Sequence, residues 1–150
     1  LNVQVCSDSI GQRKYSGPGG QFEFVQGANL ANGRSIICVK SSAIVKDKNI
    51  SNITTTFPPF ACVTVPRFFT DTIITEYGVA EILYKSKIDR ARALINIAHP
   101  EFREKLAEEA KKIGVWEGSV GFEKTSQKLF YESVSFYTKI KKRIKSWFSH

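Results

Sequence analysis

The feature that most constrains this chain is a glycine-rich segment, Tyr15–Phe24, in which Gly17, Gly19 and Gly20 stand directly before a predicted helix start. Glycine has no side chain, so backbone N–H groups in such a loop can approach an oxyanion or a phosphate. Glycine-rich turns that only redirect the chain are commoner, and the loop alone does not decide between the two. With strands and helices around it, such a loop is typical of an α/β domain.

The apolar pattern predicts strands around this loop. Alternation predicts a strand over Leu1–Cys6, and the polar segment Ser7–Gly20 reads as a long loop. After the glycines we expect a short helix that ends near residues 29–33, and then a buried, β-branched strand over Ser35–Lys40. Three further strand candidates follow: Ile50–Phe57, Ala61–Val65 and Thr72–Tyr77. The first of them is a strand or one arm of a hairpin, and the last carries Glu76 at its end.

Helices dominate the next part of the chain. Ser86 is a suitable N-cap for a helix whose apolar residues recur at spacings of three and four. Pro100 is expected to be the first residue of a second helix, with His99 as its cap and Gly114 at its end. Strands followed by helices predict an α/β fold with one domain of ordinary size.

Composition narrows the class of protein. Of the 150 residues, 42% are hydrophobic, which is enough for a core, and no apolar run of 18 residues occurs. A soluble, cytoplasmic domain is therefore the expectation. The sequence contains no methionine and opens on a strand-like segment. For that reason we expect a fragment of a longer protein.

The three cysteines, Cys6, Cys38 and Cys62, lack the spacing of a zinc site or a redox motif, and we expect buried free thiols. His99 and His150 are too few and too far apart to build a metal site. The sequence therefore predicts no metal.

The net charge of +8 is concentrated in the tail. Residues 118–150 hold seven Lys or Arg against two Glu, which leaves +3 for the first 117 residues. We expect a linker at Gly118–Gly121 and then a basic amphipathic helix carrying Phe136, Ile140 and Ile144 on one face. Such a helix packs on its own domain or on a second subunit, or lies on an anionic membrane.

Three segments together resemble the C-terminal domain of the acetyl-CoA hydrolase/transferase family, which includes acetate, succinyl and 4-hydroxybutyrate CoA-transferases. They are the glycine loop, the T-E-Y-G-V-A segment Thr75–Ala80, and the segment Arg90–Arg103 with its A-H-P-E-F-R end. The likeness runs over residues 1–117, and we expect the domain to be incomplete at its N-terminus. It implies a CoA-transferase-like domain with a mixed β-sheet flanked by helices.

The resemblance also implies a site. In this family a glutamate attacks the acyl-CoA thioester, and the reaction passes through an acyl-glutamyl anhydride and a glutamyl-CoA intermediate. That glutamate lies upstream of the glycine loop, in sequence that this chain does not contain. Gly20, with Gly19 beside it, takes the position that donates to the thioester oxygen, and CoA is expected to pass Gly17, Gly19 and Gly20.

Two charged residues complete the expected site. Glu76 takes a supporting role there, whereas without the resemblance it reads as a solvated turn. Arg67 binds a carboxylate or a CoA phosphate, or else makes a surface ion pair; Phe69 stands where the family pattern has an acidic residue.

The chain is therefore expected to be the C-terminal part of a CoA-transferase or acyl-CoA hydrolase, with coenzyme A as substrate and without activity alone. Expected partners are an acyl-CoA, a small carboxylate and the missing N-terminal domain; a homodimer and a membrane contact through the tail stay open. The alternative is a non-catalytic CoA-binding remnant or a basic membrane-binding module. Nucleic-acid binding is not expected, since no groove-fitting motif accompanies the basic residues.

Overall fold

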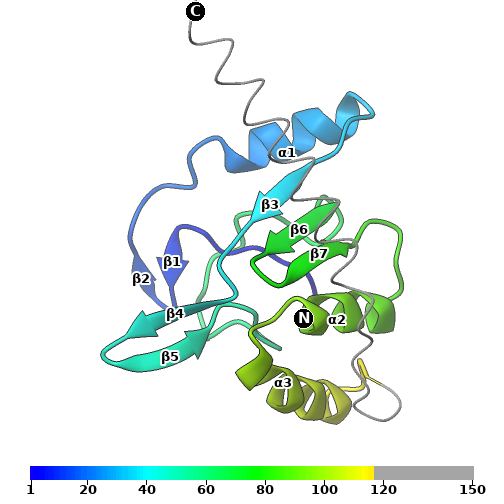
Figure 1. The fold of residues 1–150 in the computed structure, drawn as a ribbon. Coiled ribbons are helices and arrows are strands. Elements are labelled where there is room, and N and C mark those ends of the chain that lie inside the picture. Colours follow the sequence, from blue (N-terminus) through cyan, green and yellow to red (C-terminus); the bar gives the residue numbers. More distant parts are fainter. Residues whose placement is uncertain (117–150) are drawn as a thin grey trace, which may run out of the picture.

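The structure, a computed structural model, describes residues 1–116 (Figure 1). Its elements in chain order are β1 (Ser9–Ile10), β2 (Arg13–Lys14), α1 (Gln21–Leu30), β3 (Ile36–Cys38), β4 (Ser42–Val45), β5 (Lys48–Ser51), β6 (Thr72–Thr75), β7 (Gly78–Glu81), α2 (Lys87–Asn96) and α3 (Pro100–Lys112).

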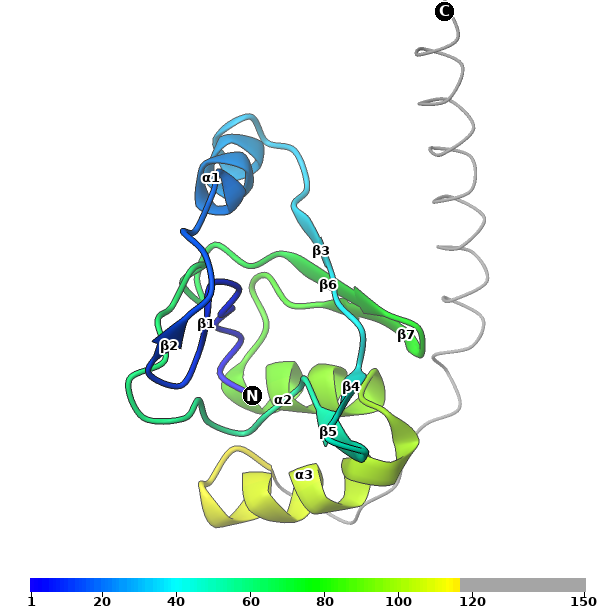
Figure 2. The ribbon, with the colours of Figure 1, turned by 90° about the vertical axis from the view of Figure 1, so that its left-hand side faces the viewer.

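A three-stranded mixed sheet lies at the centre, in the order β3-β6-β7. Strand β3 runs parallel to β6, with Ile37 opposite Ile73, and β7 runs antiparallel to β6. Two small antiparallel hairpins, β1-β2 and β4-β5, lie apart from this sheet. In both views the sheet lies between α1 on one side and α2 with α3 on the other (Figures 1 and 2). The predicted mixed sheet with helices around it is thus present.

The hydrophobic core forms where α2 packs against β7 and α3. Ile82, Ile95 and Ile97 are fully buried there, and the N-terminal residues Leu1 and Val3 pack into the same cluster. Burying a side chain of this size stabilises the fold by about 1.5–3 kcal/mol. The helix pair and the N-terminal segment therefore hold one side of the sheet together.

The helix ends follow the local signals in the sequence. The Ser86 hydroxyl caps α2 by accepting a hydrogen bond from the Asp89 amide at 3.1 Å. His99 caps α3, and Pro100 is its first residue. Gly114 ends α3 with a φ of +69°, a backbone conformation that glycine adopts without strain. All three predictions are confirmed.

Two predicted strands are wrong. Leu1–Cys6 is not a strand, because Val3 has a φ of 69° and turns the chain out of the extended conformation. The segment Ala61–Val65 is a loop as well. What remains of both is a single antiparallel bridge between Val5 and Val65. Alternation in the sequence therefore reflected burial of Leu1 and Val3 rather than a ladder.

Strand β3 confirms the strand predicted within Ser35–Lys40 but not its burial. It lies at the edge of the sheet with one neighbour, so that Ile36 is 47% exposed. Cys38 on this strand and Cys62 in a loop are exposed and Cys6 is half-buried, so the prediction of buried thiols is wrong; all three are free.

The predicted linker and basic amphipathic helix over residues 118–150 lie outside the described residues. Within residues 1–116, no helix is long and apolar enough to cross a membrane. Over the same range, His, Cys, Asp and Glu side chains form no group of three that could hold a metal ion.

Candidate functional site

The glycine loop is exposed from Gly17 to Gly20 and leads directly into α1. It is fixed at its start by the Asp8 carbonyl, which accepts hydrogen bonds from the Tyr15 amide at 2.8 Å and the Ser16 amide at 3.3 Å. Gly19 has a φ of +59°, which favours glycine. Gly20 is the N-cap residue, and no side chain caps the helix. The first amides of α1 are thus available to a ligand oxygen.

Phe24 lies over this loop. A Cβ placed on Gly20 would come within 3.3 Å of the Phe24 ring, whereas one placed on Gly17 or Gly19 would meet nothing within 4 Å. Phe24 is nevertheless 82% exposed. In a helix, side chains lean toward the N-terminus and cover the preceding turn, which explains this position. The Phe24 ring therefore lies beside the predicted donor position.

Glu76 lies in the two-residue turn between β6 and β7, because the strand predicted over Thr72–Tyr77 already ends at Thr75. Its carboxylate accepts hydrogen bonds from Ser41, which is fully buried. The Ser41 hydroxyl donates to Oε1 at 2.5 Å and the Ser41 amide to Oε2 at 2.9 Å. Partial burial raises the pKa of Glu76, but the bonds from the Ser41 hydroxyl and amide and the nearby His99 outweigh it, so that the pKa lies below its ordinary value.

The residues around Glu76 anchor its turn to the helices. The buried Thr75 hydroxyl donates to the Ile97 carbonyl at 2.6 Å and accepts from the Tyr77 amide at 3.1 Å. The Tyr77 ring meets His99 edge-on, with 5.4 Å between ring centroids. Arg103 lies over the same ring at 5.6 Å and donates to the Ala98 carbonyl. The turn is thereby fixed at its base, while the Glu76 side chain stays exposed.

Arg67 is exposed, and its side chain forms no ion pair within residues 1–116. Phe69, two residues on, packs edge-to-face on Phe22 of α1 with ring centroids 5.2 Å apart. Its carbonyl also accepts a hydrogen bond from the Asn29 amide group at 2.9 Å. Phe69 therefore connects the Arg67 loop to the helix that follows the glycines, and an acidic side chain could not make the ring contact.

The predicted site residues fall into two groups. Figure 2 shows α1 at the upper left and the β6-β7 hairpin at mid-height toward the right. No hydrogen bond or ion pair among the described residues joins the glycine loop to Glu76. Gly17, Gly19 and Gly20 lie directly before α1, whereas the Arg67 carbonyl accepts a hydrogen bond from Arg90 of α2 at 3.5 Å. Ser41 and Thr75 were missed as partners of the site, since only the fold brings them to Glu76 and Ile97.

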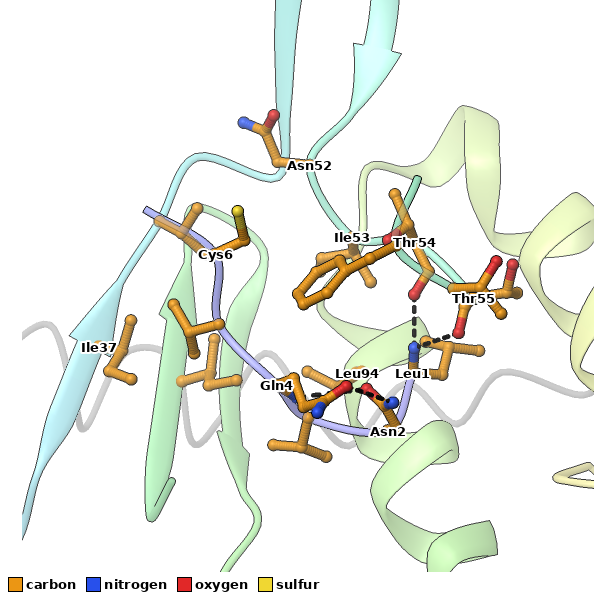
Figure 3. Close-up of a pocket in the computed structure, with 16 residues that line it drawn as sticks. Leu1, Asn2, Gln4, Cys6, Ile37, Asn52, Ile53, Thr54, Thr55 and Leu94 are labelled. Carbon is orange, nitrogen blue, oxygen red and sulfur yellow. Dashed lines mark hydrogen bonds between the residues drawn. The ribbon is translucent and has the colours of Figure 1, made fainter. Parts of the chain in front are cut away.

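A separate apolar pocket of about 120 Å³ opens beside the N-terminal segment (Figure 3). Leu1, Ile37, Ile53 and Leu94 line it, and the Leu1 amine donates to the carbonyls of Thr54 and Thr55. None of the predicted site residues lines this pocket.

Comparison with known proteins identifies the class. The chain is similar to the probable butyrate:acetyl-CoA coenzyme A-transferase of Syntrophomonas wolfei, at 44% identity over 79% of this chain and 27% of the relative. It is 50% identical to the 4-hydroxybutyrate coenzyme A transferase of Clostridium kluyveri over 75% of this chain and 26% of that protein. These relatives are CoA-transferases, and the chain spans about a quarter of their length.

The solved structure of RipA from Yersinia pestis superposes with a TM-score of 0.67 at 36% identity, over 76% of this chain and 25% of RipA. The sequence model of the acetyl-CoA hydrolase/transferase C-terminal domain matches residues 1–110. This chain belongs to that family, as its three motifs indicated.

Proposed function

We propose that this chain is the C-terminal part of a CoA-transferase or acyl-CoA hydrolase that moves CoA between small carboxylic acids such as acetate. The observation that carries the proposal is the exposed glycine loop, whose amides start α1 without a side-chain cap in a chain of this family. Such amides can stabilise the oxyanion that forms when a thioester carbonyl is attacked.

In the proposed reaction, a glutamate outside this chain attacks the thioester carbonyl. The C–S bond breaks, CoA leaves as its thiolate, and an acyl-glutamyl anhydride forms. The thiolate then attacks the glutamyl carbonyl and expels the free carboxylate, which leaves glutamyl-CoA. Gly20 and Gly19 would donate to the oxyanions of both steps, while Glu76 orients neighbouring groups and Arg67 holds a substrate carboxylate or a CoA phosphate.

A hybrid enzyme tests this proposal. Residues 1–116 replace the corresponding segment of the Clostridium kluyveri enzyme, and transfer of CoA from acetyl-CoA to 4-hydroxybutyrate is followed by chromatography. We expect transfer in the hybrid, and a kcat about 100-fold lower with Gly20→Val. Gly27→Val is the matched control, because a Cβ at Gly27 meets nothing within 4 Å on the same helix.

Three results would count against parts of the proposal. A folded hybrid that neither transfers nor binds CoA contradicts the function as a whole. An active hybrid that tolerates Gly20→Val contradicts the role of the loop. An inactive hybrid, together with CoA binding to the 150-residue chain by calorimetry, favours the alternative of a non-catalytic CoA-binding protein.

A further inference from the structure

The bond between Ser41 and Glu76 joins two segments that are 35 residues apart in sequence. Ser41 follows β3 by a short link and stands directly before β4, whereas Glu76 turns the chain from β6 into β7. Both donors of Ser41, its amide and its hydroxyl, are directed at one carboxylate. An ionised carboxylate only accepts hydrogen bonds, so the hydroxyl must be the donor.

Ser41 is itself held in place. Its carbonyl accepts a hydrogen bond from the Asn52 amide at 2.9 Å, and the Asn52 side chain donates to the Lys40 carbonyl at the same distance. Two residues earlier, the Val39 amide donates to the Ile74 carbonyl at 3.0 Å. Hydrogen bonds therefore fix the backbone on both sides of Ser41, independently of its contact with Glu76.

Ser41 and Glu76 differ in how accessible they are to a substrate. Ser41 has no exposed surface, whereas Glu76 is exposed. A substrate could reach the carboxylate but not the hydroxyl. Ser41 can thus affect a reaction only through Glu76.

We propose that Ser41 is a positioning residue for the reaction proposed above: it holds the Glu76 carboxylate ionised and in one orientation, as an acceptor for a hydrogen-bond donor of the bound substrate. The inference rests on the proposed function. Hydrogen bonds from a buried amide and hydroxyl reduce the basicity of a carboxylate, which makes it a weaker nucleophile and a better fixed acceptor. This separates the role of Glu76 from that of the attacking glutamate outside the chain.

The test uses the hybrid enzyme for kinetics and the 150-residue chain for titration of the Glu76 carboxyl by carbon-13 NMR. With Ser41→Ala we expect kcat to fall by about tenfold or more, with little change in KM for acetyl-CoA. The Glu76 pKa should rise toward its ordinary value of 4.5, and the acid limb of the kcat profile should move to higher pH with it. Ser42→Ala, in the next residue, is the matched control and should behave like the parent.

Two conservative variants separate positioning from packing. Ser41→Thr keeps the hydroxyl and should restore most of kcat, while Ser41→Cys, which is close to threonine in size but offers only a weak donor, should not. If circular dichroism shows that Ser41→Ala does not fold, the comparison of Ser41→Thr with Ser41→Cys tests the inference in its place.

The inference is overturned if an active hybrid keeps its kcat with Ser41→Ala, or loses it while Glu76 titrates as in the parent. A folded hybrid that transfers no CoA before any substitution overturns the proposed function, and this inference with it.

Discussion

The Glu76 carboxylate is stabilised in its ionised form by Ser41, and this gives the chain a specific dependence on pH. Its folded-state pKa lies below the ordinary value of 4.5. The hydrogen bonds therefore contribute fully to stability above that ordinary value, and the contribution is lost as the pH falls through the lowered folded-state pKa.

We expect Glu76→Gln to reduce the free energy of unfolding at about pH 6 and to have a smaller effect at about pH 3, because the contribution of the ionised carboxylate declines as the pH falls below the ordinary value toward the lowered folded-state pKa. Urea unfolding followed by circular dichroism at the two pH values measures this. Glu104→Gln is the control, since Glu104 is exposed on α3 and has no hydrogen-bond partner within residues 1–116. An equal effect of Glu76→Gln at both pH values would contradict the prediction.

At the scale of elements, the hairpin of β6 and β7 is attached to the end of α2 through the Thr75 hydroxyl. Thr75→Val keeps the shape of the side chain but leaves the buried Ile97 carbonyl and the Tyr77 amide without this partner. We expect a loss of about 1–3 kcal/mol in the free energy of unfolding, measured in urea. Thr56→Val, at an exposed threonine, should cost much less. A cost equal to that of the control would show that the hydroxyl does not hold the hairpin.

Elements whose signals are local could be predicted from the sequence. The caps at Ser86 and His99 and the glycine end of α3 depend on neighbouring residues, and all were found in the expected places. Strand β7 was missed because the last strand candidate, Thr72–Tyr77, ran through the turn, and no strand was predicted over Gly78–Glu81. The long-range contacts of Ser41 and Thr75 leave no local pattern, so sequence reasoning could place Glu76 at a strand end but not name its partners.

At the scale of the whole molecule, large apolar side chains are exposed over several elements. Phe24 and Leu30 on α1 are 82% and 78% exposed, and Ile44 on β4 is 79% exposed. Each of these side chains can lose apolar surface to water when two chains associate.

We expect Leu30→Lys combined with Ile44→Lys to lower self-association of the 150-residue chain at high concentration, with Tm nearly unchanged. Light scattering and thermal unfolding measure the two effects. Thr56→Lys adds charge without removing apolar surface and serves as the control. Equal scattering from the parent and the double variant would contradict the prediction.

The place of β6 between β3 and β7 has a consequence for motion. The central strand of a sheet is the last to lose its hydrogen bonds in local unfolding, and the Glu76 turn follows β6 directly. We therefore expect the Glu76 carboxylate to be among the least mobile exposed groups of the domain. Helix α1 is attached differently, through the Phe22 ring and the Asn29 side chain, both of which meet Phe69. For the proposed reaction we therefore expect the glycine loop to be the more adaptable contact to the thioester and the Glu76 carboxylate to be the fixed one.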